Sequence, residues 1–491
     1  MVRSLRSRPR GQAGGPHVSQ DAGRGMPRWL PMGAAAFLTA AALGAAGAGG
    51  PAAAAPAASP DFGPNVVIFD PSMPTAEIQA KADAIWADQV DDEMGPNRYG
   101  LLFKPGVYGD DAQPLQIKVG YYTEVAGLGA APGDVTINGK VEVRNRCFDE
   151  DPEFTGCFAL NNFWRGLSNL TIKVNSAGQD GCTATANFWA VSQAVSLRRV
   201  EVTGANLSLM DYCTGPSFAS GGFIADSKSG VILNGSQQQW YARNTEVGNW
   251  TNAVWNQVFS GMSFTDPALA PQDSAYPNPP YTVLEKTPLN REKPYLFVDA
   301  NGAYQVRVPA ARTNTSGISW ASGMTPGRTI PLSDFFVARP GDSVQTINNQ
   351  LARGRHLLLT PGLYDVARSI EVKRADTVVL GIGLPTLTAV NGATPMTIAD
   401  KPGIILAGVT IDAGEVESPV LLQVGKPNGN NGVANNNPNN PTTLSDVYFR
   451  VGGPYVGKAA GRCGPRSRRL RCARHRSSVG PRGADATTLR P

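Results

Sequence analysis

The sequence repeats one order of short motifs, and the second copy lies 253 to 256 positions after the first. The segments 101–108 and 357–364 are both apolar runs that end in Pro-Gly-x-Tyr. A Gly-x-Gly step and then an Asn-Gly step follow in each copy. These steps are Gly127-Leu128-Gly129 and Asn138-Gly139 in the first copy, and Gly381-Ile382-Gly383 and Asn391-Gly392 in the second. Chance does not readily produce three motifs in the same order, so the chain is predicted to contain a duplicated module.

Each copy follows a segment in which apolar residues recur at helical spacing. The recurring residues are Ile78, Ala82 and Ile85 before the first copy, and Val344, Ile347 and Leu351 before the second. Intervals of three or four positions place these side chains on one face of a helix. Each module is therefore predicted to begin with a short amphipathic helix.

Within each module, strands of alternating residues are approached through a polar corner. They occupy 167–174, 197–202, 405–411 and 444–451, and the first two begin 30 residues apart. That interval is too long for a tight hairpin but suits one coil of a parallel β-helix, in which β-branched residues stack inward from coil to coil. The predicted fold class is all-β, a right-handed parallel β-helix in two tandem modules. The alternative is an antiparallel sandwich.

The pattern divides the chain into five segments. They are a leader at 1–57, a first β-helix module at 58–264, a linker at 265–335, a second module at 336–458 and a tail at 459–491. The linker contains an Asn-Gly step, Asn301-Gly302, between two alternating apolar runs, which predicts a β-hairpin over 294–308.

Charge and histidine usage exclude several classes of protein. The chain of 491 residues has a net charge of +5, but residues 1–30 carry +5 and residues 459–491 carry +8, which leaves −8 for 31–458. An acidic body removes the argument for nucleic-acid binding. Only three histidines occur, and His356 is the one in the body, which argues against a Ser-His-Asp triad and against a His-ligated zinc site. We expect no metal and no cofactor.

The leader has the order of a secretory signal peptide. Six arginines precede an apolar run at 29–43, and small residues follow around Ala53-Ala54-Ala55. A membrane anchor is the alternative, although the run is short and rich in Ala and Gly. Export permits disulfides. The four cysteines of the body allow three pairings, of which Cys147–Cys157 and Cys182–Cys213 close the shortest loops.

The tail differs in character from the rest of the chain. The stretch 462–476 is rich in arginine and has no strand alternation and no helical stripe. One interpretation is an out-of-frame end that leaves the second module truncated, and the other is a functional basic arm. We expect residues 459–491 to pack against nothing.

The candidate catalytic groups are carboxylates, because a body with a single histidine argues against catalysis by a histidine-based triad. Cleavage of a glycosidic bond needs one carboxyl group that donates a proton and a second that activates water or attacks. Asp180, Asp211, Asp226 and Glu246 recur in the first module at intervals like those of a coil, and we take Asp211 and Asp226 as the candidates. The alternative for each is a solvated corner carboxylate or a turn cap.

Tryptophans gather in the first module together with asparagines. Flat rings beside amide groups suit sugars, whose CH faces are apolar and whose hydroxyls need hydrogen-bond partners. We expect Trp240, Trp250 and Trp255 to form the wall of a sugar-binding groove. Packing at the edge of the core is the alternative.

The leading helix and the Pro-Gly-x-Tyr turn resemble the start of β-helices of the pectate-lyase superfamily. Two such modules joined by the Tyr-Leu-Phe-Val-Asp hairpin at 295–299 resemble glycoside hydrolase family 55, secreted enzymes that act on β-1,3-glucan. The stretch 212–259 is similar to secreted actinobacterial β-helix proteins whose longer members carry a discoidin-like domain. The chain also resembles the α-1,3-glucanases of glycoside hydrolase family 87. No catalytic motif of these families matches residue by residue, so none is transferred.

The resemblance implies a secreted glycoside hydrolase whose partner is a glucan-like polysaccharide, with no nucleic acid and no membrane after signal cleavage. It also implies a groove between the two modules, in which the second module supplies the proton donor. A truncated second module then predicts glucan binding with little hydrolysis. The alternatives are a glycan- or wall-binding scaffold without catalysis, and a polysaccharide lyase.

Overall fold

A computed structural model describes residues 60–147, 157–214, 217–235, 238–251, 255–425, 437–454 and 456–460, and the backbone of 463–464. The leader at 1–57 and most of the tail lie outside these residues, as do the expectations made for them. In the described part of the chain, no helix has the length and apolar character needed to cross a membrane.

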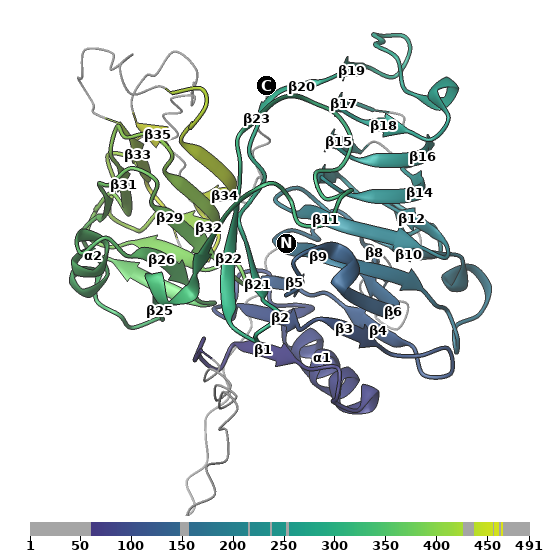
Figure 1. The fold of residues 1–491 in the computed structure, drawn as a ribbon, viewed down its shortest axis with the longest axis horizontal. Helices are drawn as coiled ribbons and strands as arrows, with labels where there is room; N and C mark the ends of the chain where they lie inside the picture. The colour runs from purple at the N-terminus through teal and green to yellow at the C-terminus, as the bar shows by residue number, and fades with distance from the viewer. Residues whose placement is uncertain are drawn as a thin grey trace, which may run out of the picture. The chain divides into compact units, whose positions relative to one another are not determined.

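The first part of the chain forms one β-helix whose neighbouring strands pair in parallel (Figure 1). Its strands are β1 (Val66–Phe69), β2 (Tyr99–Phe103), β3 (Gly106–Tyr108), β4 (Leu115–Lys118), β5 (Thr123–Gly127), β6 (Val135–Glu142), β9 (Arg165–Val174), β10 (Ala186–Phe188), β11 (Ser196–Thr203), β12 (Asn206–Ser208), β13 (Gly221–Ala225), β14 (Lys228–Leu233), β15 (Gln239–Arg243), β16 (Glu246–Thr251), β17 (Gln257–Ser260), β18 (Ser263–Phe264) and β19 (Tyr281–Leu284). The strand β19 pairs with β17, so the first β-helix extends past residue 264, where we expected the linker to begin.

The second β-helix repeats this design with strands in two sheets. Its strands are β25 (Phe335–Ala338), β26 (His356–Leu359), β27 (Leu363–Val366), β28 (Ile370–Val372), β29 (Val378–Gly381), β30 (Thr386–Ala389), β31 (Met396–Ile398), β32 (Ile405–Asp412), β33 (Leu422–Val424), β34 (Thr443–Arg450) and β35 (Cys463–Gly464). All of these pairings are parallel, which confirms a parallel β-helix and excludes the antiparallel sandwich.

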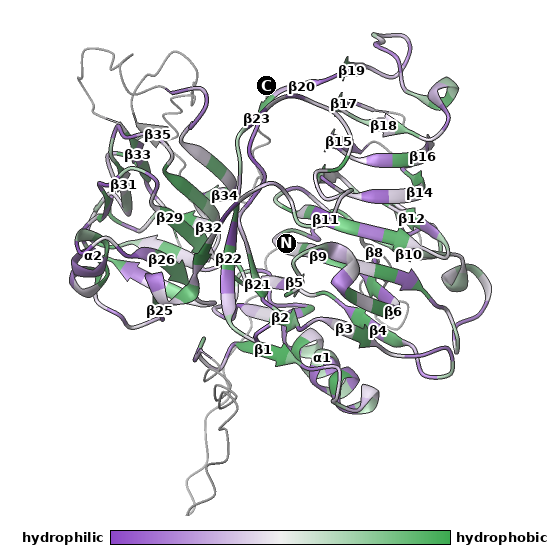
Figure 2. Cartoon of the chain, in the orientation of Figure 1, coloured by the Kyte–Doolittle hydropathy of each residue, from purple (hydrophilic) through white to green (hydrophobic). Residues whose placement is uncertain are grey.

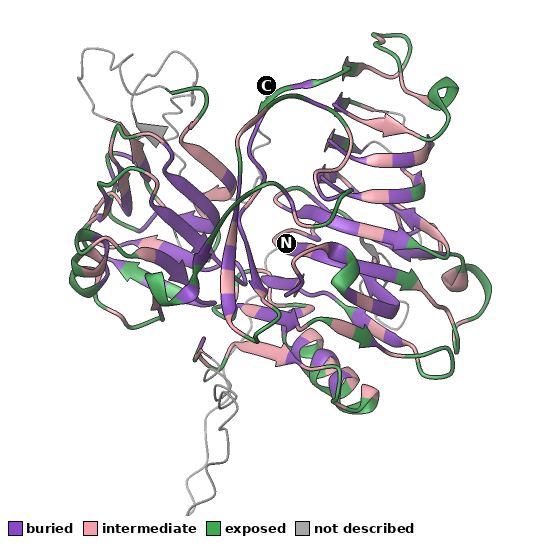
Figure 3. Ribbon diagram, viewed as in Figure 1, coloured by how far each residue is buried: buried purple, intermediate pink, exposed green. Residues whose placement is uncertain are grey.

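Inward-pointing residues of successive coils stack on one another. Leu167, Leu197, Ile224, Ala242 and Phe259 are register partners in sequence, and all are buried. The coils therefore take 30, 27, 18 and 17 residues, and the interval of 30 is the one that the sequence predicted. Hydrophobic residues occupy the strands (Figure 2), and the same strands are mainly buried (Figure 3).

Both predicted helices are present, but each follows a first strand, β1 or β25, that already pairs within its β-helix. The helix α1 (Thr75–Gln89) buries Ile78, Ala82 and Ile85 in the core of the first β-helix. The helix α2 (Val344–Ala352) buries Ile347 and Leu351 in the core of the second. The Oγ of Ser343 accepts a hydrogen bond from the Thr346 amide at 3.1 Å and so caps α2.

The Pro-Gly-x-Tyr motif closes the same corner in both modules. The Tyr108 hydroxyl donates to the carbonyls of Phe69 and Lys104, at 3.0 and 2.8 Å. The Tyr364 hydroxyl donates to the carbonyls of Ala338 and Thr360, at 2.9 Å each. The glycine is required because a Cβ on Gly106 would lie 2.6 Å from the Cβ of Pro71, and the φ of Gly106 is +148°.

The polar corners that precede the alternating strands have a left-handed backbone. We name the residues at these corners of the first module the corner ladder: Asn169, Arg199, Asp226 and Asn244, with φ between 48° and 56°. Asp446 is in the same conformation in the second module, with φ 51°. Asn and Asp tolerate this region better than most residues, because their short polar side chains bond locally.

The linker contains the predicted hairpin. The strands β21 (Tyr295–Val298) and β22 (Tyr304–Pro309) pair antiparallel, and β24 (Gly327–Pro331) adds to β22. A second antiparallel pair consists of β20 (Thr287–Asn290) and β23 (Arg312–Thr315). One apolar cluster contains Leu102 of the first module, Val306 of the hairpin and Leu380 of the second module, so the hairpin packs against both.

One of the two predicted disulfides is present among the described residues. Cys182 and Cys213 are bonded, with their Cα atoms 5.6 Å apart. Cys147 and Cys157 lie opposite each other where the short strands β7 (Arg146–Cys147) and β8 (Cys157–Phe158) pair antiparallel. The side chains of these two cysteines lie outside the described residues.

Candidate functional site: a cleft between the two β-helices

A cleft of about 380 Å³, open to solvent, lies where the two β-helices face each other. The first module contributes the outer faces of β11, β13 and β15, the linker contributes 289–291, and the second module contributes 441–446. The lining residues are Arg198, Phe223, Tyr241, Arg243, Leu289, Asn290, Arg291, Pro441, Thr442, Thr443, Leu444, Ser445 and Asp446.

Phe223 and Tyr241 form an aromatic wall on the side of the first module. They are register partners on β13 and β15, and their ring centroids lie 5.1 Å apart. Strand alternation explains why they point outward, because their neighbours Ile224 and Ala242 point into the core. Tyr241 is 38% exposed and Phe223 is half-buried, so both rings can contact a ligand.

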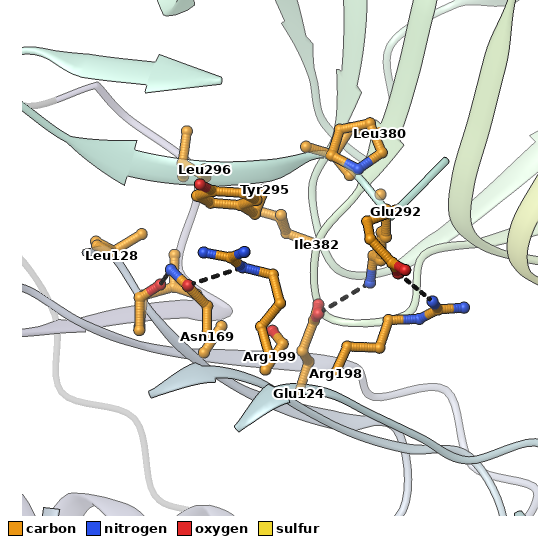
Figure 4. A pocket seen from close by; sticks show the side chains of 17 residues that line it. Glu124, Leu128, Asn169, Arg198, Arg199, Glu292, Tyr295, Leu296, Leu380 and Ile382 are labelled. Atoms are coloured by element: carbon orange, nitrogen blue, oxygen red, sulfur yellow. Dashed lines mark hydrogen bonds and ion pairs between the residues drawn. The ribbon is translucent and has the colours of Figure 1, made fainter. Parts of the chain in front are cut away.

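A chain of alternating charges runs from the cleft lining into the neighbouring pocket. We name it the junction network: Arg243, Glu292, Arg198, Asp446, Lys293 and Glu124, with successive distances of 2.6, 3.6, 2.7, 3.5 and 3.2 Å. Its members come from the first module, the linker and the second module. Figure 4 shows how Arg198, Glu292 and Glu124 meet in the pocket behind the cleft.

Asp446 is the one carboxylate that lines the cleft among the described residues. Burial opposes its ionisation, but Arg198 and Lys293 outweigh this effect and hold its pKa well below the ordinary range. Ser196 also donates to it at 3.0 Å. Asp446 is therefore ionised and serves as an acceptor of hydrogen bonds rather than as a proton donor.

Asp226 lies in the corner ladder under the linker, fully buried. Its carboxylate accepts hydrogen bonds from the amide and the hydroxyl of Ser319, and Arg199 lies 3.4 Å away. Burial and the nearby Glu292 raise its pKa to about 7, while Arg199 opposes the shift. No side-chain atom of Asp226 reaches the cleft surface, so in this structure it ties the linker to the first module.

Asp211 is also fully buried, and its partners are structural. It accepts from the Asn145 amide and lies 3.2 Å from Arg144. Its other oxygen accepts from the amides of Cys213 and Thr214, at 3.1 Å each, and thereby fixes the turn that carries the disulfide. Neither Asp211 nor Asp226 belongs to the lining of the cleft, and the described partners of each are structural.

Two of the three expected groove tryptophans lie in the core. Trp240 is 2% exposed and donates through Nε1 to Gln238, and Trp250 is 7% exposed and packs edge-on against Phe259. Their place on the inner face leaves no ring face for a sugar, which corrects the expectation for these two residues. Trp255 is half-buried and contacts Tyr276 with ring centroids 5.8 Å apart, outside the set of cleft residues.

The sequence contained a signal for the actual aromatic wall. Phe223 and Tyr241 each stand one position from a small or aliphatic residue that the coil pattern places inward. The alternation of inward and outward side chains along these strands, rather than the size of the rings, decides which aromatic residues line the cleft and which lie in the core. In the described part of the chain, no group of three or more His, Cys, Asp or Glu is placed to hold a metal ion.

Comparison with known proteins identifies the family. A family model described as LAM55 pectate lyase-like domain matches residues 335–464, and one described as rhamnogalacturonase A/epimerase, pectate lyase-like, matches 112–266. An exo-β-1,3-glucanase of Streptomyces sp. (strain SirexAA-E / ActE) is 44% identical over 402 residues, which are 81% of this chain and 60% of that protein. The chain belongs to the glycoside hydrolase family 55 group.

Solved structures agree with this assignment to family 55. The structure of sacteLam55A from Streptomyces sp. SirexAA-E matches with a TM-score of 0.72 and 43% identity, over 82% of this chain and 67% of that one. A variant of the same protein in complex with glucose matches equally well. The family 55 chain described here spans about three fifths of the length of the curated glucanase.

Proposed function

We propose that this chain is a secreted glucan-binding protein of family 55 and that the cleft between its β-helices holds β-1,3-glucan. The observation that carries the proposal is the 402-residue similarity to an exo-β-1,3-glucanase, which covers 81% of this chain. The bonded pair Cys182–Cys213 supports export, because disulfides persist in oxidising compartments.

The chemistry of the cleft suits a sugar chain. Phe223 and Tyr241 offer ring faces for the apolar CH faces of glucose units. On the side of the second module, Thr442, Thr443 and Ser445 offer hydroxyl groups that donate or accept hydrogen bonds. A wall of rings facing polar groups is the usual composition of a ligand site that fixes orientation.

We further propose that the described cleft residues bind glucan with little hydrolysis. Hydrolysis needs a carboxyl group that is protonated at working pH and a second that is ionised. Asp446 supplies an ionised group, and the described lining contains no second carboxyl. Loss of one member of an acid/base pair typically removes about 10²–10⁴-fold of rate.

The test measures binding and cleavage side by side. The 491-residue chain is mixed with insoluble β-1,3-glucan and with α-1,3-glucan, and reducing-sugar release from laminarin is followed. We expect retention on β-1,3-glucan, weaker retention on α-1,3-glucan and little sugar release. Robust hydrolysis that Asp211→Asn or Asp226→Asn abolishes would contradict the role assigned to Asp446 and place catalysis in the first module.

Variants of the aromatic wall locate the binding site. Tyr241→Ala and Phe223→Ala are each expected to weaken laminarin binding about tenfold in calorimetric titration, because each removes a stacking ring. Phe218→Ala is the matched control, since Phe218 is 48% exposed and lies outside the cleft lining. Equal affinities for all three variants would place the glucan site elsewhere.

A further inference from the structure

Three arginines of the cleft have N–H groups without a hydrogen-bond partner among the described residues. The groups are Nη1 of Arg198, Nε of Arg243 and Nε of Arg291, and all three are buried. A buried donor without a partner costs free energy, which a ligand with suitable acceptors recovers on binding. The three groups belong to residues that line one cleft, so this cost is concentrated at a single site.

Arg291 differs from the other two in its charge balance. Arg198 pairs with Asp446 and Arg243 pairs with Glu292, whereas no ion pair to Arg291 is found among the described residues. Its guanidinium donates to the carbonyl of Pro441 at 3.0 Å and to the side-chain oxygen of Asn440 at 2.8 Å. The residue is only 9% exposed, so a positive charge is held in the cleft wall with neutral partners.

The neighbourhood of Arg291 does not neutralise this charge directly. Asn440 donates to Asp376 at 2.8 Å and accepts from Arg291, so the Asn440 amide lies between Arg291 and the Asp376 carboxylate. Arg328 donates to the Asp376 carbonyl and brings a second positive charge to the same side. Burial and Arg328 together lower the pKa of Arg291, while Asp376 opposes them.

The excess of positive charge is local. Residues 31–458 carry a net −8. Within the cleft lining, Arg198 and Arg243 are paired with Asp446 and Glu292, which leaves Arg291 as the arginine without an ion pair among the described residues. A cationic site on an acidic body attracts an anion to that site rather than to the protein surface in general.

We propose that the Arg291 side of the cleft binds an anionic group, so that the cleft prefers a glucan bearing carboxylate, sulfate or phosphate substituents over the neutral polymer. This inference rests on the proposed function, because it assumes that the glucan lies in the cleft. Guanidinium groups bind oxyanions through charge-assisted N–H hydrogen bonds, and Arg291 and Arg243 each have one Nε–H group without a described partner. The aromatic wall holds the sugar ring while the substituent contacts Arg291 and Arg243.

The first experiment compares laminarin with sulfated laminarin at one ionic strength by calorimetric titration. We expect sulfated laminarin to bind about tenfold more tightly to the unmodified chain. Arg291→Gln is expected to abolish this preference. Arg353→Gln is the matched control, because it removes the same charge from an exposed position on the second module outside the cleft, and it should leave the preference unchanged.

The outcomes separate this inference from the proposed function. Equal binding of both polymers by the unmodified chain overturns the anionic site and leaves the glucan site standing. A preference that survives in Arg291→Gln also overturns the inference, since general attraction between charges then explains it. Failure to bind either polymer overturns both proposals.

A second arm covers a folding defect in Arg291→Gln and distinguishes a free anion from a substituent. Arg291→Lys keeps the charge but not the planar fork, and is expected to retain part of the preference. Inorganic sulfate, added at constant ionic strength with chloride as the balancing salt, should compete with sulfated laminarin for the unmodified chain. If Arg291→Lys kept the full preference and sulfate did not compete, the arginine-specific site would be contradicted. If sulfate competed but the unmodified chain showed no preference between the two polymers, the site would belong to a free anion and the glucan preference would be overturned.

Discussion

Tyr108 and Tyr364 occupy the same position in the two modules, and their hydroxyl groups have equivalent partners. Each hydroxyl is buried and donates to two carbonyls from the preceding strand and the corner. The motif that revealed the duplication is therefore a structural corner and takes no part in ligand binding. Its recurrence follows from the need to satisfy two buried carbonyls with one side chain.

Removal of either hydroxyl is expected to destabilise the fold. Tyr108→Phe and Tyr364→Phe each leave two buried carbonyls with fewer partners, at a cost of about 1–3 kcal/mol in the free energy of unfolding. Urea denaturation of each variant provides the measurement. The control is Tyr276→Phe, because Tyr276 is 64% exposed and should show almost no change. Stability equal to the unmodified chain in both corner variants would show that water replaces the hydroxyl.

Asp226 should make stability depend on pH in an unusual direction. Its pKa is raised by burial to about 7 in the folded protein, against an ordinary value of 3.8. At pH values between these two pKa values, the Asp226 carboxyl holds its proton in the folded state more often than in the unfolded state. The contribution of Asp226 to stability is therefore fully present below pH ~4 and is lost as the pH rises through about 7.

The measurement is the difference in unfolding free energy between the unmodified chain and Asp226→Asn at a series of pH values. We expect this difference to fall from pH 4 to pH 7 and to level off above it. Carboxylates that do not interact with Asp226 cancel in the difference, including Asp446, whose lowered pKa acts in the opposite direction. Asp365→Asn, at an exposed position, is the control and should give a flat difference. A rising difference for Asp226→Asn would contradict the raised pKa.

At the scale of elements, the hairpin and its preceding segment connect the two β-helices through charges. Lys293 lies between Glu124 of β5 and Asp446 of β34, at 3.2 and 3.5 Å. One linker side chain therefore contacts both modules. Its role depends on residues 169 positions before it and 153 positions after it in the chain.

Lys293→Met is expected to destabilise the protein strongly, because it leaves two buried carboxylates facing each other without their shared cation. Breaking a buried pair by removing one partner typically costs about 3–5 kcal/mol. Thermal unfolding measures the loss, with Lys373→Met as the control at an exposed position. A variant as stable as the unmodified chain would mean that Arg198 alone compensates Asp446.

The sequence predicted local features better than contacts across the junction. Helical spacing identified α1 and α2, the Asn-Gly step identified the β21–β22 hairpin, and cysteine spacing identified the Cys182–Cys213 bond. Each of these depends on residues within about 30 positions. The parity of β15 was missed, because Trp240 and Tyr241 are adjacent aromatic residues that suit either face, and the alignment of Ala242 with Ile224 is the weaker signal that separates them.

The sequence did not predict the junction network, and the reason is different. Asp446 and Arg198 are 248 positions apart, and only the packing of two separately coiled units brings them to 2.7 Å. The sequence suggested Asp226 as a catalytic acid, whereas the structure places it at a buried corner with a left-handed backbone. A structural carboxylate and a catalytic carboxylate at such a corner look the same in the sequence, so the sequence alone does not separate them.

At the scale of the whole molecule, one apolar cluster unites residues from both β-helices and the linker. Leu102, Leu296, Val306, Leu358 and Leu380 are all buried in it. We expect calorimetry to show a single unfolding transition, because neither module can retain its packed surface after the other unfolds. Two well-separated transitions would show that the modules unfold independently and that the cluster contributes little.

The uneven coil lengths have a geometric consequence for the cleft. Although the coils shorten from 30 to 17 residues, the register keeps one outward side chain per coil at each position, with neighbouring strands about 4.8 Å apart. Phe223, Tyr241 and Val258 therefore stand at equal steps along the axis of the first β-helix. A polymer lying along this face meets a new side chain at every step, so the spacing of binding positions is set by the backbone and does not change when a connecting loop grows or shrinks.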